Sequence, residues 1–124
     1  MNLNQVTIAV TNIDKAIEFY EKLGLELIVR SENYCRFIVP GNEATFSIHQ
    51  TERFQSNETV VYFETDNVEK KINELRSKGL EISAGPVMQS WLWYEAYIND
   101  PDGNKICIYH AGENRLNPPW QIKK

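Results

Sequence analysis

Hydrophobic and polar residues follow the same order twice along this chain. When the sequence is slid against itself, identical residues meet at Asn12 and Asn67, Lys15 and Lys70, Ile17 and Ile72, and at Gly24-Leu25-Glu26 and Gly79-Leu80-Glu81. Each copy predicts a strand, an amphipathic helix that begins after an asparagine cap and ends at a glycine, and then a further strand. A unit with one apolar face cannot bury that face alone, so we expect the two copies to share a core.

The alternation of apolar residues gives the expected elements of each copy. In the first copy, residues 5–10 form a strand, 13–23 a helix, and 25–30, 34–39 and 44–50 three strands. In the second copy, residues 59–65 form a strand, 68–78 a helix, and 80–83, 90–99 and 105–110 three strands, with Gly85-Pro86 breaking the chain after the first of these. The pattern therefore predicts an α+β fold made of two βαβββ modules.

Short polar and proline-rich stretches mark the expected boundaries. Residues 51–58 are polar and predict a linker, and Asp100–Asn104 has the composition of a hairpin turn. We expect one domain over residues 1–112, with modules at about 1–54 and 58–112. Residues 111–124 are too rich in proline for a helix, and residues 113–124 are expected to form a tail that wraps the surface or is loose.

Composition narrows the class of protein. A chain of 124 residues with 42% hydrophobic and 24% charged residues suits one globular domain. The net charge of −4 argues against nucleic acid as a partner, and without a long apolar run or a signal-peptide pattern we expect no membrane span and a cytoplasmic protein. Cys35 and Cys107 lack metal-binding spacing and are expected to be reduced, packed thiols.

The duplicated module, the run Phe19-Tyr20-Glu21-Lys22-Leu23-Gly24 and the turn Asp100-Pro101-Asp102-Gly103-Asn104 resemble the vicinal oxygen chelate superfamily. That superfamily includes glyoxalase I, extradiol dioxygenases, and the fosfomycin and bleomycin resistance proteins. The resemblance covers nearly the whole chain apart from the tail, and it implies a curled sheet around a ligand cavity. One scaffold hosts many chemistries, so the resemblance fixes the fold better than the activity. It also implies a homodimer.

The resemblance also implies where a divalent metal would be held. The corresponding positions carry Gln5, Ser47, Val60 and Cys107. Valine has no lone pair, serine and glutamine are weak ligands, and one cysteine does not complete a site that needs three or four donors. We therefore expect no metal cofactor, although the residues alone do not exclude a divalent ion.

Alternation along the strands places a set of polar and aromatic side chains on the expected cavity face. The set consists of Thr7, Ser47, His49, Tyr62, Glu64, Trp91, Trp93, Glu95, Tyr97, Cys107 and Tyr109. Such a face suits a planar or cationic organic ligand, since aromatic rings stack on planar groups and attract cations. The alternatives are that the aromatic residues fill a core or a dimer interface, that Glu95 is solvated or paired with arginine, and that His49 is a structural, hydrogen-bonded residue.

Three classes of function remain open at this stage. The first is a metal-independent binding protein of the bleomycin resistance type, which sequesters a small organic ligand without turning it over. The second is a glyoxalase-like lyase or isomerase, or a dioxygenase-like enzyme, with His49 or Glu95 as the catalytic acid or base and an atypical metal site. The third is a regulatory or partner-binding module, which an exposed aromatic patch would indicate.

Overall fold

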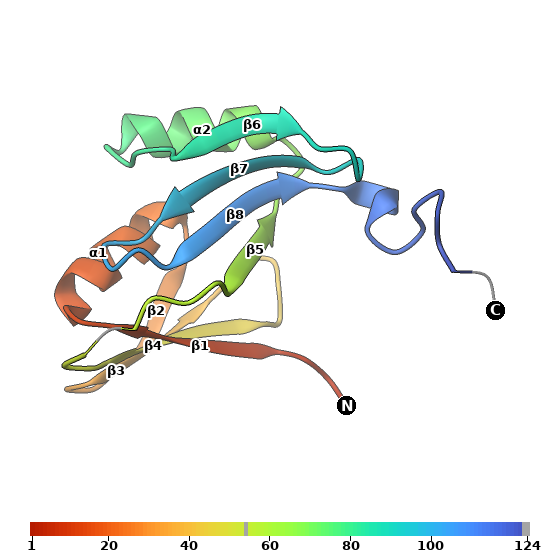
Figure 1. Cartoon of the computed structure of the whole chain (residues 1–124). Coiled ribbons are helices and arrows are strands. Elements are labelled where there is room, and N and C mark those ends of the chain that lie inside the picture. The colour runs from red at the N-terminus through yellow and green to blue at the C-terminus, as the bar shows by residue number, and fades with distance from the viewer. Residues whose placement is uncertain (54, 123–124) are drawn as a thin grey trace. The chain divides into compact units, whose positions relative to one another are not determined.

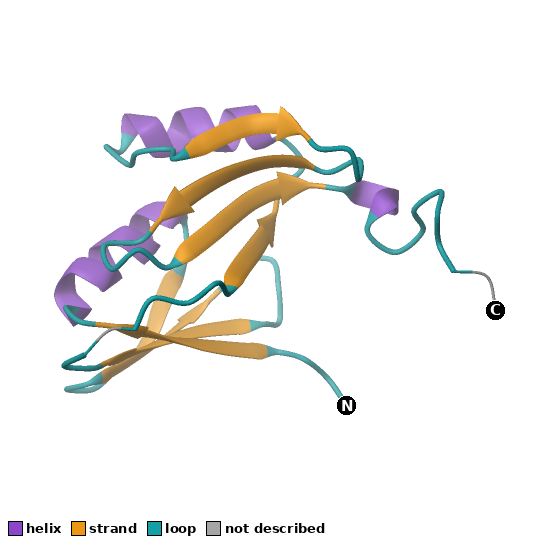
Figure 2. Ribbon diagram, viewed as in Figure 1, coloured by secondary structure: helices purple, strands orange, loops and turns teal. Residues whose placement is uncertain are grey.

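The computed structural model describes residues 1–53 and 55–122, and its secondary structure is drawn in Figures 1 and 2. The chain divides into two compact units. The first unit comprises Met1–Asn57 and Asp100–Asn104, and the second comprises Glu58–Asn99 and Lys105–Lys124. Phe54, in the expected linker, lies outside the described residues. No helix in the described ranges is long and apolar enough to cross a membrane.

The first unit is a four-stranded mixed sheet with one helix. Its elements are β1 (Gln5–Val10), α1 (Ile13–Leu23), β2 (Glu26–Arg30), β3 (Tyr34–Ile38) and β4 (Thr45–Gln50). The strand order is β1-β4-β3-β2, with β1 parallel to β4 and the other neighbouring strands antiparallel. The first strand of the module therefore pairs with the last one, as a βαβββ module requires.

The second unit repeats this arrangement. Its elements are β5 (Val60–Glu64), α2 (Val68–Ser77), β6 (Ala84–Met88), β7 (Tyr94–Asn99), β8 (Lys105–His110) and the short 3-10 helix η1 (Gly112–Asn114). The order β5-β8-β7-β6, with β5 parallel to β8, matches that of the first unit. The prediction of an α+β fold with two βαβββ modules is confirmed.

The repeated asparagines cap the two helices in the same way. The side-chain oxygen of Asn12 accepts a hydrogen bond of 3.0 Å from the backbone N–H of Lys15, and Asn67 accepts one of 3.0 Å from Lys70. Each bond satisfies one of the N–H groups that the first turn of a helix leaves without a partner. Both helices thus begin at the residues that the repeat predicts.

The core of the first unit forms between α1 and its sheet. Tyr20 is fully buried, and its ring centroid lies 4.7 Å from that of Phe46 and 6.0 Å from that of Phe37. Its hydroxyl donates a hydrogen bond of 2.8 Å to the buried Asp100. Burial and the Asp100 carboxylate raise the pKa of Tyr20 far above its usual range.

The turn Asp100–Asn104 is fixed by its own side chains and by the first unit. Asp100 accepts from the backbone N–H groups of Asp102 and Asn104, both at 2.9 Å. Asp102 accepts from the N–H and hydroxyl of Thr11 at 2.9 and 2.6 Å, and the Asn104 amide donates to the carbonyl of Ala9 at 2.9 Å. The turn predicted from composition is therefore a well-anchored part of the first unit.

Three sequence predictions for the second unit are wrong in detail. The strand expected at residues 80–83 lies instead at β6, which contains Gly85 and Pro86. Proline is tolerated there because β6 is an edge strand with a register shift between Ala84 and Val87. The strand expected at 90–99 begins only at Tyr94, because residues 90–92 form a turn with Leu92 at φ 68°. The tail starts with the helix η1, ahead of its prolines.

Candidate functional site

Four aromatic side chains of the second unit, Tyr62, Trp93, Tyr97 and Tyr109, form what we term the aromatic cluster. The rings of Trp93 and Tyr109 stack at a centroid distance of 4.7 Å with 23° between their planes. Tyr62 meets both rings edge-on, at 5.8 Å from Trp93 and 5.4 Å from Tyr109. Trp93 and Tyr97 are partly buried, whereas Tyr62 is 44% exposed, so the cluster reaches the surface of the unit.

Glu95 is the buried carboxylate beside this cluster. It is only 1% exposed, and its two oxygens accept hydrogen bonds from the Tyr97 hydroxyl at 2.9 Å and the Trp91 indole N–H at 3.2 Å. Within residues 1–53 and 55–122, no lysine, arginine or histidine forms an ion pair with it. The expected alternatives of a solvated or arginine-paired Glu95 are therefore wrong. A buried charge held only by neutral donors has a large desolvation cost.

Strand register explains why these residues lie together. Glu95 pairs with Tyr109 and Tyr97 with Cys107 across β7 and β8, and Tyr62 pairs with Cys107 across β5 and β8. Directly paired residues project from the same face of a sheet. The predicted pairing of these two strands is thus confirmed, while Trp91 reaches Glu95 from the turn that precedes β7.

Cys107 lies at the base of the cluster as a packed thiol. It is fully buried, and burial together with the nearby Glu95 charge raises its pKa to about 12. A thiol with that pKa is almost entirely protonated at neutral pH, and thiolate is the reactive and metal-binding form. Cys107 therefore supplies neither a nucleophile nor a ready metal ligand, and the expectation of a packed thiol is confirmed.

Glu64 anchors the segment after β8. One of its oxygens accepts from the backbone N–H groups of Ala111 and Gly112 at 2.8 and 2.9 Å, and the side chains of His110 and Arg115 lie at 3.8 and 3.9 Å from its carboxylate. Desolvation opposes ionisation, but these donors and charges prevail and lower the pKa of Glu64. Its observed partners belong to the backbone and side chains of its own unit.

The first unit carries a separate group, which we term the polar cluster: Gln5, Tyr34, Arg36 and Ser47. The Tyr34 hydroxyl accepts from Arg36 Nε at 2.9 Å and lies 2.7 Å from the Ser47 hydroxyl. The Gln5 amide donates to Ser47 at 2.9 Å and to Tyr34 at 3.4 Å. Sequence reasoning missed Tyr34 and Arg36, although their alternation on β3 opposite Ser47 and His49 would have indicated them.

Two other residues predicted for the cavity face, Thr7 and His49, take no part in the hydrogen bonds of the polar cluster. Thr7 pairs with Ser47 across β1 and β4, and His49 pairs with Tyr34 across β4 and β3. Both are exposed, and neither side chain forms a hydrogen bond to the described part of the chain. The alternative of a hydrogen-bonded, structural His49 is therefore wrong for the described residues, and none of them orients its ring as a general base.

The chemistry at the four metal positions of the family does not fit a divalent ion. The Gln5 amide donates a hydrogen bond to the Ser47 hydroxyl, Val60 has no atom that could bind a metal, and Cys107 is a buried, protonated thiol. Across the described ranges, no group of three or more His, Cys, Asp or Glu side chains could hold a metal. A divalent ion needs several oxygen, nitrogen or thiolate donors directed at one point.

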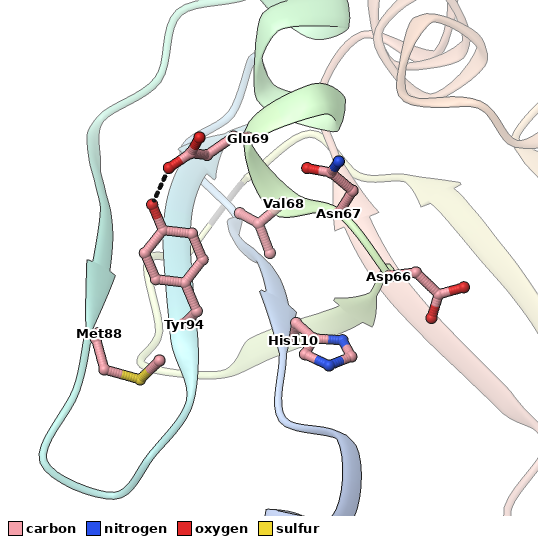
Figure 3. Close-up of a pocket in the computed structure, with 7 residues that line it drawn as sticks. All are labelled: Asp66, Asn67, Val68, Glu69, Met88, Tyr94 and His110. Atoms are coloured by element: carbon pink, nitrogen blue, oxygen red, sulfur yellow. Dashed lines mark hydrogen bonds between the residues drawn. The ribbon is translucent and has the colours of Figure 1, made fainter.

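Sequence reasoning also missed a hollow of about 390 Å³ on the other face of the second sheet (Figure 3). Its lining consists of Asp66, Asn67, Val68, Glu69, Met88, Tyr94 and His110. Tyr94 donates a hydrogen bond of 2.6 Å to Glu69, which raises the pKa of Tyr94. Tyr94 pairs with His110 across β7 and β8, so this hollow is distinct from the aromatic cluster, whose residues alternate with these two.

Comparisons with known proteins agree with this architecture. The chain is 26% identical to a trivalent organoarsenical cleaving enzyme of Bacillus sp. (strain MD1), over 96% of this chain and 81% of that protein. An integron cassette protein from the mobile metagenome of the Halifax Harbour sewage outfall is 25% identical with a TM-score of 0.77, over 88% of this chain and 97% of that one. A bleomycin-binding protein in complex with bleomycin shares the fold at 17% identity with a TM-score of 0.74, over 89% and 98%.

A family model matches both halves of the chain. Residues 2–108 match the model of the Glyoxalase/Bleomycin resistance protein/Dioxygenase superfamily. The match spans both βαβββ modules, from before β1 to within β8. This chain belongs to that superfamily.

Proposed function

We propose that this chain is a metal-independent binding protein that sequesters a planar or cationic organic molecule on the aromatic cluster of its second unit. The observation that carries the proposal is Glu95, a buried carboxylate with no cationic partner among the described residues, beside the stacked rings of Trp93 and Tyr109. A bound cation would compensate the buried charge, and the rings would stack on a planar ligand.

The superfamily supports this reading at a coarser level. One solved relative by fold is a bleomycin-binding protein in complex with bleomycin, so the scaffold accommodates small-molecule binding. The polar and hydrophobic groups at the metal positions favour binding without a metal over metal-assisted chemistry.

A fluorescence titration tests the proposal. N-methylacridinium, a planar monocation, is compared with acridine, its uncharged counterpart at pH 8, and bleomycin serves as a second probe. We expect saturable quenching of tryptophan fluorescence by the cation, with an affinity at least about tenfold higher than that of acridine.

The variants assign any binding to the cluster. Trp93→Ala removes the stacking ring, and Trp120→Phe is the matched control, because Trp120 is 56% exposed in the tail. Loss of binding in Trp93→Ala but not in Trp120→Phe supports the proposal. If neither the acridinium nor bleomycin binds the folded protein, the proposal fails.

The relationship to an organoarsenical cleaving enzyme favours a second candidate, an enzyme of the same superfamily. In that case Glu95 would act as the acid or base, because it is the buried carboxylate of the candidate site, with His49 as the exposed alternative. Trivalent arsenic binds thiolates, whereas Cys107 is protonated at neutral pH. Stoichiometric metal in the purified protein, together with turnover of an organoarsenical or a hemithioacetal, would establish this candidate instead.

The assembly and location of the chain are part of the same proposal. A homodimer would cover the open strand edges of the two small sheets, which otherwise expose unpaired backbone groups. Sedimentation analysis at micromolar concentration tests the dimer, and a monomer would refute it. We place the protein in the cytoplasm, and fractionation of cells that express the full chain tests that assignment.

A further inference from the structure

We propose that the polar cluster of the first unit binds the carboxylate group of a small organic ligand through the terminal nitrogens of Arg36. This inference goes beyond the proposed function, which rests on the second unit. It concerns another sheet, other residues and a ligand group of opposite charge, so either can fail while the other stands.

Arg36 is held in place but leaves its terminal nitrogens available. Its Nε donates to the Tyr34 hydroxyl at 2.9 Å, and its guanidinium carbon lies 5.4 Å from the centre of the Tyr34 ring. Its side chain is partly buried. In the described part of the chain, neither terminal nitrogen makes a hydrogen bond and no carboxylate forms an ion pair with it. A guanidinium positioned in this way presents a rigid pair of donors.

The neighbouring polar groups are also fixed. The Thr45 hydroxyl donates to the side-chain oxygen of Gln5, which orients the Gln5 nitrogen away from it. That nitrogen donates to Ser47 and Tyr34, and Ser47 is fully buried. These bonds hold the Tyr34 oxygen, and with it Arg36, in one geometry before any ligand arrives. Such preorganisation reduces the entropy lost on binding.

The local electrostatics favour a negatively charged oxygen. The Arg36 guanidinium, held by its 2.9 Å hydrogen bond to the Tyr34 hydroxyl, supplies the positive charge of the polar cluster. By strand register, the acidic residue on this face of β2 is Glu26, which lies opposite Ile38. Glu26 forms no ion pair with Arg36 in the described chain, so the site keeps its positive character.

The shape of the donors selects a carboxylate. A guanidinium forms two parallel hydrogen bonds to a planar carboxylate, and charge-assisted bonds of this kind are roughly twice as strong as neutral ones. The Tyr34 hydroxyl beside it can donate one further hydrogen bond to such an oxygen when the Ser47 hydroxyl donates in the bond between the two.

The test uses benzoate as the probe and benzamide as its uncharged counterpart. The Arg36 Nε–H and backbone resonances of the labelled full-length protein are followed by NMR at constant ionic strength. We expect saturable shifts of Arg36 and Tyr34 with benzoate in the millimolar range, and no saturable shift with benzamide.

Variants distinguish the paired donors of the guanidinium from its positive charge. Arg36→Lys keeps the charge but loses the two parallel N–H donors, and is expected to weaken benzoate binding by about tenfold. Arg36→Gln should abolish it. Arg76→Gln, which removes an exposed arginine on α2, is the matched control and should bind as the parent chain does. Dispersed amide spectra confirm that each variant is folded.

The outcomes are decisive in both directions. Saturable binding that needs Arg36 and the negative charge of the probe supports the inference. Equal shifts with benzamide, unchanged binding in folded Arg36→Gln, or tighter binding of inorganic phosphate than of benzoate would overturn it. None of these results depends on whether N-methylacridinium binds the second unit.

Discussion

Replacing Glu95 by glutamine separates the stability of the fold from ligand binding. Glutamine has the same shape but no charge. Its oxygen can accept from the Trp91 indole N–H, and its NH₂ can donate to the Tyr97 hydroxyl, which is able to accept. In the parent chain these two hydrogen bonds measure 3.2 and 2.9 Å. Both can therefore persist in Glu95→Gln.

The expected change in folding free energy is small because two effects oppose each other. Two hydrogen bonds to a charged group contribute about 1.5–3 kcal/mol each, and they weaken when the charge is removed. Removing the charge also relieves a desolvation penalty of several kcal/mol for a carboxylate that is 1% exposed. We expect the free energy of unfolding of Glu95→Gln to lie within about 1 kcal/mol of that of the parent chain. Glu95→Ala leaves a cavity and donors without an acceptor, so its free energy of unfolding should fall by about 2–4 kcal/mol.

Urea denaturation and the acridinium titration measure the two quantities separately. Glu95→Gln should keep its stability and yet bind N-methylacridinium at least about tenfold more weakly, because the charge partner is gone. Glu69→Gln, at an exposed glutamate, is the control. A loss of more than about 3 kcal/mol in Glu95→Gln would show that the fold itself compensates the charge. Unchanged affinity for the cation would refute the role of Glu95.

Three further predictions concern stability. Tyr20→Phe removes the 2.8 Å hydrogen bond to Asp100 and should lower the unfolding free energy by about 1.5–3 kcal/mol in urea. The lowered pKa of Glu64 stabilises the fold above its unfolded pKa of about 4.5, and this stabilisation is lost as the pH falls through the lower folded pKa. The stability difference between the parent chain and Glu64→Gln should therefore shrink below pH 4.5. Gly85→Ala should destabilise by about 1–3 kcal/mol, because Gly85 has φ 82° and a Cβ there would clash with the carbonyl oxygen of Glu95.

Each of these has a control and a contrary result. Tyr94→Phe, which removes an exposed hydrogen bond from a tyrosine hydroxyl to the Glu69 carboxylate, is the control for Tyr20→Phe, and an equal loss in both variants would contradict the role given to the buried Asp100. A stability difference for Glu64→Gln that stays constant from pH 7 to pH 3 would show that ionisation is not involved. For Gly85, the control is Gly41→Ala, where φ is also positive but nothing lies near the added atom.

The sequence predicts the fold well because the repeat carries local signals. An asparagine cap, an apolar helical face and a glycine stop depend on residues a few positions apart, and Asn12 and Asn67 form matching caps. The error at β6 arises because Gly85-Pro86, a turn signal by composition, lies in an edge strand where a missing N–H is tolerated.

For the candidate sites, the sequence predicts only which side chains share a face of a strand. Strand periodicity places Glu95 and Tyr109 on one face, as register confirms. It gives no information on which polar groups lack partners, because that depends on side-chain contacts between strands far apart in sequence. The sequence alone does not show that Glu95 has no cationic partner among the described residues, that Arg36 is held by Tyr34, or that Glu64 accepts from the backbone N–H of Gly112.

A crystal structure of the protein with N-methylacridinium would show where the cation binds. We expect a planar ring stacked on Trp93 or Tyr109, with its charged nitrogen close to Glu95 and no metal ion bound by Gln5, Ser47 or Cys107. A divalent ion bonded to those side chains, or a ligand bound away from Glu95 and the aromatic cluster, would contradict this expectation.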